Sequence, residues 1–371
     1  MKNTFGQQIT YTLFGESHGD AIGIVIDGLP AGIKINQDFL LKQMDKRKAK
    51  GKISTQRHEM DQVEFISGYF KDHTTGSPLT ILIKNQTMKS SDYETLQYRV
   101  RPSHSDFTAN EKYHGYQDYR GGGHFSGRLT APIVAAGAIA LQLLHAMGIE
   151  IGSHIKTIKD INDCDFSDHE TTLLNEIRAM NEKDFAVLDE SKEKAMIALI
   201  EETAKAKDSI GGILETAIVH VPTGIGEPFF DSIESTLSHL LFSIPAVKGV
   251  EFGLGFGFRN HFGSEVNDPL YYDGKVKTKT NNNGGINGGI SNGMPILIKT
   301  VVKPTPSIYK QQETINLKTL KSELIEIEGR HDPAIIHRAR VVVDSMVAIG
   351  ILELIMQRNG CESINIKEED L

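Results

Sequence analysis

Short apolar runs rich in β-branched residues indicate strands near both ends of the chain. Residues 22–27 and 79–84 are two such runs, and glycine or proline borders each of them. This combination is typical of β-strands. The same pattern predicts strands over residues 213–221 and 296–302, which are separated by long glycine-rich loops.

A helix that is apolar on nearly every face is predicted over residues 130–147. Pro132 falls near its start, where the missing N–H group costs little. Residues 129–149 contain no Asp, Glu, Lys or Arg, and these 21 residues could cross a bilayer of about 30 Å. However, Pro132, Gln142 and His145 interrupt the run. Because a helix that is apolar all round is normally surrounded by protein, we expect it at the centre of the fold, without membrane contact.

The middle of the chain is charged and favours helices. Over residues 160–209, Glu and Lys are interspersed with apolar residues, which predicts amphipathic helices at the periphery. No Ser/Gly linker, Pro-rich boundary or fixed-period repeat divides the sequence. We therefore predict one mixed α/β domain over residues 1–371.

The balance of charges restricts the partners of the protein. The 371 residues include 40 Lys and Arg against 48 Asp and Glu, for a net charge of −8. This argues against a protein whose whole surface binds nucleic acid, but it is compatible with a local basic pocket. Cys164 and Cys361 are too few for a disulfide framework and lack metal-site spacing. Because the N-terminus also lacks a signal-peptide pattern, we expect a cytoplasmic protein without a metal site.

Common nucleotide-binding and hydrolase motifs are absent from the sequence. There is no phosphate loop ending in Gly-Lys-Ser/Thr, no nucleophile elbow and no His-Glu-x-x-His. Residues 253–258 lack the third glycine of a dinucleotide fingerprint. ATP hydrolysis and zinc-dependent proteolysis are therefore disfavoured.

Three loops combine glycine or proline with titratable or cationic side chains. Residues 15–19 place His18 between glycines, where it can approach a ligand closely; a tight turn with an exposed histidine is the alternative. Residues 101–106 hold His104 after a proline, and alone they fit an ordinary loop better. Residues 120–128 contain three consecutive glycines and two arginines and lead into the apolar helix. Free N–H groups at its start favour binding of an anion or cofactor.

Three further segments have both a structural and a functional interpretation. A basic run between residues 42 and 57 is either a solvated face or loop, a nucleic-acid site, or a site for a small ligand bearing phosphate and carboxylates. Residues 281–293 include five glycines, and they either connect strands flexibly or lay bare backbone against a flat ring. Residues 329–333, Gly-Arg-His-Asp-Pro, suit either acid–base chemistry or a salt-bridged surface turn.

Taken together and in this order, these segments resemble the chorismate synthase family from about residue 4 to residue 356. The motifs that carry the resemblance are residues 15–19, 27–30, 92–93, 101–104, 118–123, 135–140, 226–228, 243–251, 284–293 and 329–333. The resemblance implies an α/β (α+β) sandwich with helices packed between antiparallel sheets, assembled as a homotetramer. It also implies a carbon–oxygen lyase of the shikimate pathway. Such a lyase converts 5-enolpyruvylshikimate 3-phosphate to chorismate by 1,4-elimination of phosphate, and it requires reduced FMN.

Matching the family motifs residue by residue implies roles for single side chains. His18 would be the general acid for the departing phosphate, His104 would act at the reduced flavin, and Asp332 would assist proton transfer at flavin N5. The implied substrate-binding residues are Arg47, Lys52, Arg128 and Arg330. Of these, Arg47 and Lys52 face either the substrate or a nicotinamide cofactor. The implied FMN contacts are His124, Phe125, Ser126, Pro245, Ala246, Gly288, Lys303, Pro304, Thr305, Pro306, Ser307 and Arg330. The resemblance leaves open whether NADPH reduces the flavin on this protein.

Two departures from the family pattern affect binding. Many members carry arginine and serine where this chain has His124 and Phe125. In addition, Lys46 stands in place of an arginine that could form a bidentate fork. The alternative from another functional class is a flavin- or phosphate-binding protein that has lost turnover. Retention of all three implied catalytic residues argues against that alternative.

Overall fold

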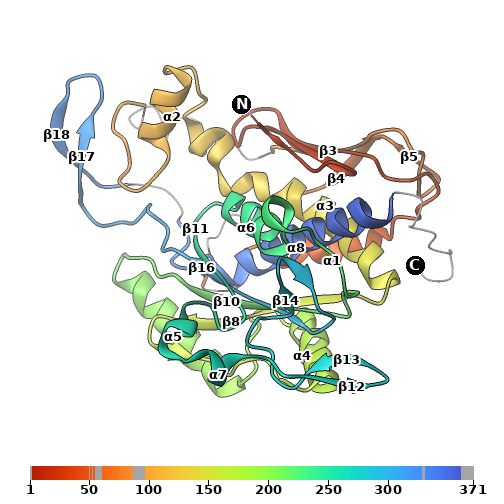
Figure 1. Cartoon of the computed structure of the whole chain (residues 1–371). Coiled ribbons are helices and arrows are strands. Elements are labelled where there is room, and N and C mark those ends of the chain that lie inside the picture. Colours follow the sequence, from red (N-terminus) through yellow and green to blue (C-terminus); the bar gives the residue numbers. More distant parts are fainter. Residues whose placement is uncertain are drawn as a thin grey trace.

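Two five-stranded antiparallel sheets enclose a layer of helices in the computed structural model (Figure 1). The structure describes residues 2–49, 51, 53–54, 61–86, 97–327 and 331–360. The strand order in the first sheet is β1 (Thr4–Phe5), β2 (Thr10–Gly15), β3 (Ala21–Asp27), β7 (Leu79–Lys84) and β4 (Val63–Ser67). The order in the second sheet is β11 (Val247–Phe252), β16 (Ile296–Val302), β10 (Gly212–Val219), β8 (Glu150–Ile158) and β9 (Ile161–Asn162).

The layer between the sheets contains α1 (Gln37–Arg47), α3 (Thr130–Ala146), α6 (Ile233–Ser243) and α8 (Ile336–Asn359). Helix α3 contacts β3 and β7 of the first sheet and β8 of the second. Of the chain that the structure describes, only Gly127–Ala146 is a helix long and apolar enough to cross a membrane, and 89% of its most apolar stretch is buried in protein. The predicted central helix over residues 130–147 is therefore confirmed.

Helices α3 and α8 approach each other closely at Gly137. A Cβ atom added to Gly137 would lie 2.2 Å from Cβ of Ser345 in α8, far inside van der Waals contact. Only glycine allows this separation of the two backbones. The position of each central helix is thus fixed by the other.

Two amphipathic helices cover the second sheet from its other side and edge. Helix α4 (Glu170–Glu182) packs on β8 and β10, and α5 (Glu190–Lys205) packs at the edge strand β9. The apolar face of α4 contributes Leu173, Ile177 and Met180 to a small second core. The expectation of peripheral amphipathic helices over residues 160–209 is confirmed.

The remaining elements lie in the connections between these layers. They are α2 (Asp106–Tyr113), η2 (Arg120–Phe125), η3 (Gly127–Leu129), η4 (Phe229–Asp231), η5 (Gly255–Asn260), α7 (Gly263–Val266), β5 (Tyr69–Phe70), β6 (His73–Thr74), β12 (Leu270–Asp273), β13 (Lys275–Thr278), β14 (Ile286–Asn287), β15 (Ile290–Ser291), β17 (Gln312–Asn316) and β18 (Lys321–Ile325).

The α/β (α+β) sandwich implied by the family resemblance is confirmed. Strands β3, β7, β10 and β16 also confirm the four strands predicted from apolar runs. The sequence pattern did not predict α1 or α8. Helix α1 carries part of the basic run, yet Arg47 at its end is only 5% exposed. Helix α8 buries Arg340, Asp344 and Glu353, and these charges obscure its apolar periodicity.

Glu353 of α8 ties the last helix to the first sheet. Its carboxylate accepts backbone N–H groups from Gln7 at 2.7 Å, Gln8 at 3.0 Å and Ile9 at 2.9 Å. The Glu353 side chain is buried. Burial of the neighbouring Tyr11, and then the charge of Glu353, raises the pKa of the Tyr11 phenol. One carboxylate thus satisfies three donors of the turn between β1 and β2.

We predict that Glu353→Ala lowers the free energy of unfolding by about 3 kcal/mol, because it strands backbone donors that had an ionised acceptor. Equilibrium unfolding in urea measures this difference. Glu202→Ala, at an exposed glutamate of α5, is the control and should change stability by less than about 0.5 kcal/mol. A loss below about 1 kcal/mol for Glu353→Ala would contradict the anchoring role.

Candidate active site

A cavity of about 960 Å³ lies at the N-terminal ends of α3 and α8, between them and the first sheet. It gathers segments that are far apart in the sequence. The predicted site residues that line it are Arg47, His104, His124, Phe125, Ser126, Arg128, Pro245, Ala246, Lys303, Thr305, Pro306 and Asp332. Most of the residues assigned by family resemblance therefore share one hollow.

Other predicted residues lie elsewhere. His18, Gly288, Pro304 and Ser307 are not among the side chains that line the cavity in the part of the chain that the structure describes. Gly288 lies in the turn between β14 and β15. Lys52 and Arg330 fall outside the described residues. The roles of these six residues stay predictions.

Positive charge is concentrated in this cavity. Among the described lining residues, seven are Lys or Arg and only two, Asp61 and Asp332, are acidic. The basic residues are Lys2, Arg47, Lys48, Arg128, Lys248, Lys303 and Arg338. The N-terminal ends of α3 and α8 add the positive ends of two helix dipoles. A chain of net charge −8 thus contains an internal site suited to anions.

Two of the three consecutive glycines lie against the two motif histidines. Gly121, Gly122 and Gly123 all have positive φ angles, of 58°, 84° and 53°. A Cβ atom on Gly121 would lie 2.2 Å from Cε1 of His18, and one on Gly122 would lie 3.4 Å from Cε1 of His104. The buried His18 therefore lies against the bare backbone of Gly121, which lines the cavity.

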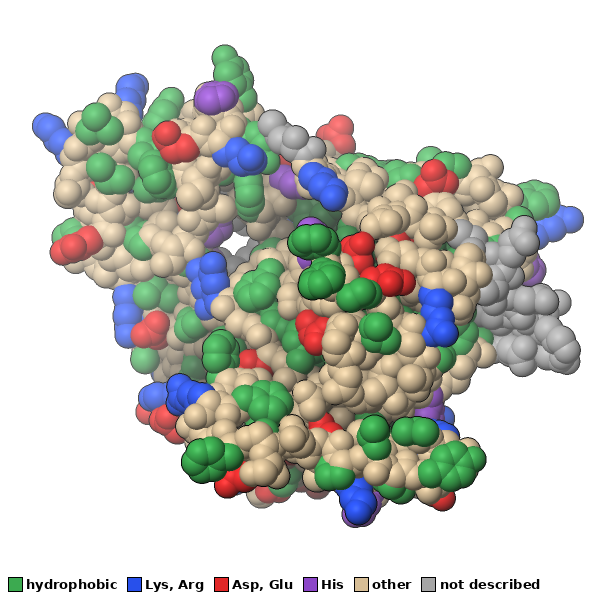
Figure 2. All heavy atoms as spheres, in the orientation of Figure 1, with side chains coloured by type: hydrophobic (Ala, Val, Ile, Leu, Met, Phe, Trp, Pro, Cys, Tyr) green, Lys and Arg blue, Asp and Glu red, His purple; other side chains and the backbone are tan. Residues whose placement is uncertain are grey.

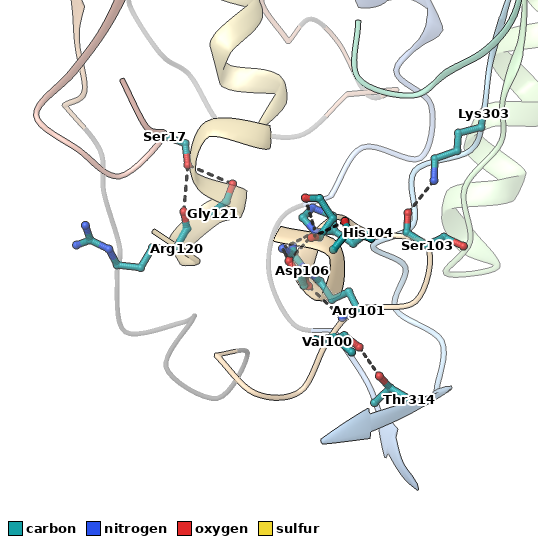
Figure 3. Close-up of polar contacts among 12 residues, drawn as sticks. Ser17, Val100, Arg101, Ser103, His104, Asp106, Arg120, Gly121, Lys303 and Thr314 are labelled. Atoms are coloured by element: carbon teal, nitrogen blue, oxygen red, sulfur yellow. Dashed lines mark hydrogen bonds and ion pairs between the residues drawn. The ribbon is translucent and has the colours of Figure 1, made fainter. Parts of the chain in front are cut away.

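Ser17 fixes both the glycine loop and the neighbouring imidazole. Its Oγ donates towards the carbonyl oxygens of Arg120, at 3.2 Å, and Gly121, at 3.1 Å (Figure 3). The same oxygen lies 3.1 Å from Nδ1 of His18. Because its single hydrogen points to a carbonyl, the hydroxyl accepts from Nδ1–H.

His104 is held by an ion pair behind it. Its Nδ1 lies 2.6 Å from Oδ1 of Asp106, and Arg101 donates to both oxygens of Asp106, at 2.7 and 2.8 Å (Figure 3). Burial by itself would raise the pKa of Asp106, but hydrogen bonds from Arg101 and His104 hold it well below its usual range. An ionised Asp106 accepts a hydrogen bond from Nδ1–H, so it fixes both the orientation and the tautomer of His104.

Asp332 is linked to Arg47 through one arginine. Arg338 Nη1 donates to Oδ2 of Asp332 at 2.6 Å, and Arg338 Nε donates to the carbonyl oxygen of Arg47 at 2.9 Å. The neighbouring His331 is a different case, because it does not line the cavity. Its burial, together with Arg101 and His104, lowers the pKa of His331 to about 4, so it is neutral at pH 7.

Two lysines lie together on another wall. Lys303 Nζ donates to the carbonyl oxygen of Ser103 at 2.8 Å (Figure 3). Burial, and then the charge of Lys248, lowers the pKa of the Lys303 ammonium group. Two mutually repelling cations are a favourable setting for a bound phosphate.

Comparison with known proteins settles the family. A family model described as chorismate synthase matches residues 9–356. The chain belongs to the chorismate synthase family. A chorismate synthase of Pyrococcus abyssi is 46% identical over 358 residues, covering 96% of this chain and 98% of the relative. A chorismate synthase of Dehalococcoides mccartyi is 45% identical over 359 residues, covering 96% of this chain and 97% of the relative.

A solved structure extends this likeness to the fold. A crystal structure of chorismate synthase matches with a TM-score of 0.76 at 26% identity, and the match covers 99% of this chain and 98% of the solved one. The family resemblance predicted from the ordered motifs is therefore confirmed both by sequence and by fold.

The motifs did not identify four charged residues in or next to this chorismate synthase family site. Asp106 and Lys248 lie in or directly after family motifs, so attention to charged neighbours would find both. Asp61 and Arg338 lie outside the motifs. Arg338 meets the carbonyl group of Arg47 across 291 residues, and only the fold brings such a pair together.

We predict that Gly121→Ala lowers kcat/KM at least tenfold, because the new Cβ atom would overlap the His18 imidazole and would require a strained positive φ. Gly127→Ala is the matched control in the same loop. Gly127 also lines the cavity, but its Cβ would meet nothing within 4 Å. Equal rates for the two variants in an anaerobic chorismate assay would refute the link between Gly121 and His18.

Proposed function

We propose that this chain converts 5-enolpyruvylshikimate 3-phosphate to chorismate in the cationic cavity, by 1,4-elimination of phosphate and a ring proton. The observation that carries the proposal is the set of seven Lys and Arg side chains facing a space with two carboxylates. The substrate bears one phosphate and two carboxylates, so this charge distribution matches it. Arg47 and Arg128, which are buried at the cavity wall, are the proposed substrate cations.

His18 is the proposed general acid. When the carbon–oxygen bond to phosphate breaks, the leaving group takes both bonding electrons and is stabilised by a proton from the imidazole. The support is that Ser17 orients His18 at Nδ1, and that Gly121, which lines the cavity, places no side chain beside the imidazole. Lys52 and Arg330, assigned to substrate by family motif, are part of the same proposal.

The opposite part of the cavity is the proposed site of reduced FMN. The residues fit such a group, because Lys248 and Lys303 suit its phosphate and because a volume of about 960 Å³ is at the upper end for small-molecule sites. Reduced flavin, when bound, supplies the electronic chemistry of the elimination. His104, oriented by Asp106, and Asp332, oriented by Arg338, then hold or move protons at its edge. NADPH is the proposed source of its electrons.

The test is anaerobic. Purified protein supplied with chemically reduced FMN and 5-enolpyruvylshikimate 3-phosphate should release phosphate and chorismate in equal amounts. Binding of both ligands without product would favour a binding protein that has lost turnover. Following FMN absorbance under NADPH, without a separate reductase, tests the source of electrons, because oxidised flavin should bleach if this chain reduces it.

We predict that His18→Ala and Asp332→Ala each lower turnover by orders of magnitude while FMN affinity changes little, because both groups act on protons rather than hold the flavin. Single-turnover rates and flavin titration measure the two effects. His169→Ala, at an exposed histidine before α4, is the control and should keep its rate. Near-normal turnover in either test variant would reject the role of that residue.

We also propose that the protein is cytoplasmic and forms a homotetramer. It is proposed to have no nucleic-acid or membrane partners. Arg47 of the basic run is buried, so it faces the cavity rather than a polyanion outside. Apolar side chains gather over η5, α7 and the β12–β13 hairpin, along the lower edge in Figure 2. The most exposed of them are Phe256 at 73%, Phe262 at 78%, Leu270 at 71% and Tyr272 at 76%. Exposed apolar side chains gathered on one edge are typical of a subunit contact.

We predict that the double variant Phe256→Glu/Phe262→Glu dissociates the tetramer, because it places charges in an apolar contact. Light scattering after size-exclusion chromatography measures the mass. Phe70→Glu, at a phenylalanine of β5 that is 65% exposed, should leave the mass unchanged. A tetramer that survives the double substitution would exclude this patch as an interface.

A further inference from the structure

Asp61 joins the two proposed substrate arginines to each other. Its Oδ2 accepts from Nη2 of Arg47, and its Oδ1 accepts from Nη1 of Arg128. The carboxylate has no exposed surface, and both arginine side chains are 7% exposed. Arg47 ends α1, Arg128 precedes α3, and Asp61 precedes β4, so one carboxylate holds three elements at the cavity wall.

The charges of this trio depend on one another. Burial by itself would raise the pKa of Asp61, but Arg47 and Arg128 hold it below its usual value. Burial also lowers the pKa of Arg47, and Asp61 opposes that effect. Two buried guanidinium groups placed side by side repel each other strongly in a low-dielectric setting. The ionised carboxylate between them offsets this repulsion, and the trio keeps one net positive charge.

Two further observations show that the surrounding structure fixes Asp61 and Arg47 in these positions. Asp61 has a positive φ of 45°, which a residue other than glycine adopts only at a cost and which the two ion pairs here hold in place. Arg47 is also fixed through its backbone, because its carbonyl oxygen accepts from Arg338. Nε of Arg47 is buried and has no hydrogen-bond partner within the described part of the chain, so Arg47 retains a donor at the site.

We propose that Asp61 is a positioning residue that holds Arg47 and Arg128 together so that both face the same anionic group of the substrate. This inference rests on the proposed function for the identity of that substrate. Asp61 does not touch reacting atoms. Its negative charge weakens the overall attraction for an anion, and it compensates by fixing two flexible side chains before the ligand arrives. The opposite view, that Asp61 merely occupies the place of the ligand, predicts tighter binding when its charge is removed.

The decisive variant is Asp61→Asn, which keeps the shape of the side chain and one acceptor oxygen. We expect KM for 5-enolpyruvylshikimate 3-phosphate to rise at least tenfold, with kcat changed less than threefold. The Kd of shikimate 3-phosphate, measured calorimetrically without flavin, should rise by a similar factor. Glu64→Gln is the matched control. Glu64 lies in β4 and pairs with Lys84 at the surface at 3.0 Å, so its loss removes one charge without changing the cavity.

A second variant keeps the inference testable if Asp61→Asn does not fold. Asp61→Glu retains the charge but displaces both guanidinium groups by one methylene, and we expect KM to rise at least threefold. Unchanged or tighter binding in whichever variant folds overturns the positioning role. The proposed function fails separately. If the wild type makes no chorismate but still binds shikimate 3-phosphate more tightly than Asp61→Asn, the positioning role stands and the proposed reaction does not.

Discussion

The close packing of α3 against α8 is the constraint on which the site depends. Gly137 allows Ser345 to approach so closely that neither helix can shift without the other. Both helices begin at the cavity, and an arginine lies at each start: Arg128 in η3, which leads into α3, and Arg338 in the first turn of α8. The contact in the core therefore sets the spacing of cations at the surface of the cavity.

A second feature follows from burying so many cations. The arginines that line the cavity have acidic partners, because Arg338 pairs with Asp332, and both Arg47 and Arg128 pair with Asp61. Such pairs reduce the desolvation cost of each charge and also fix its direction. The cavity consequently keeps a net positive charge while its side chains are held in place, which is the condition for preorganised electrostatic binding.

Much of the architecture was predictable from local pattern, and part of it was not. The apolar run around Gly137 and the β-branched runs predict a helix and four strands from neighbouring residues alone, and the structure contains these elements. Helix α8 lacked such a signal, because Arg340, Asp344 and Glu353 are buried by partners from other elements. The ordered motifs identified most of the residues that line the cavity. They could not identify Asp61, whose significance depends on a pairing with Arg128 across 67 residues.

The carboxylate of Glu353 has a consequence for how the protein is made. It satisfies the backbone of Gln7 across 346 residues, so the first strands leave the ribosome long before their anchor exists. Until Glu353 of α8 emerges, the three N–H groups of the turn between β1 and β2 lack their carboxylate acceptor, and pairing of such distant segments is intrinsically slow. The attachment of this turn to the last helix is therefore a late step of folding, which cannot occur until the chain from Gln7 to Glu353 has been synthesised.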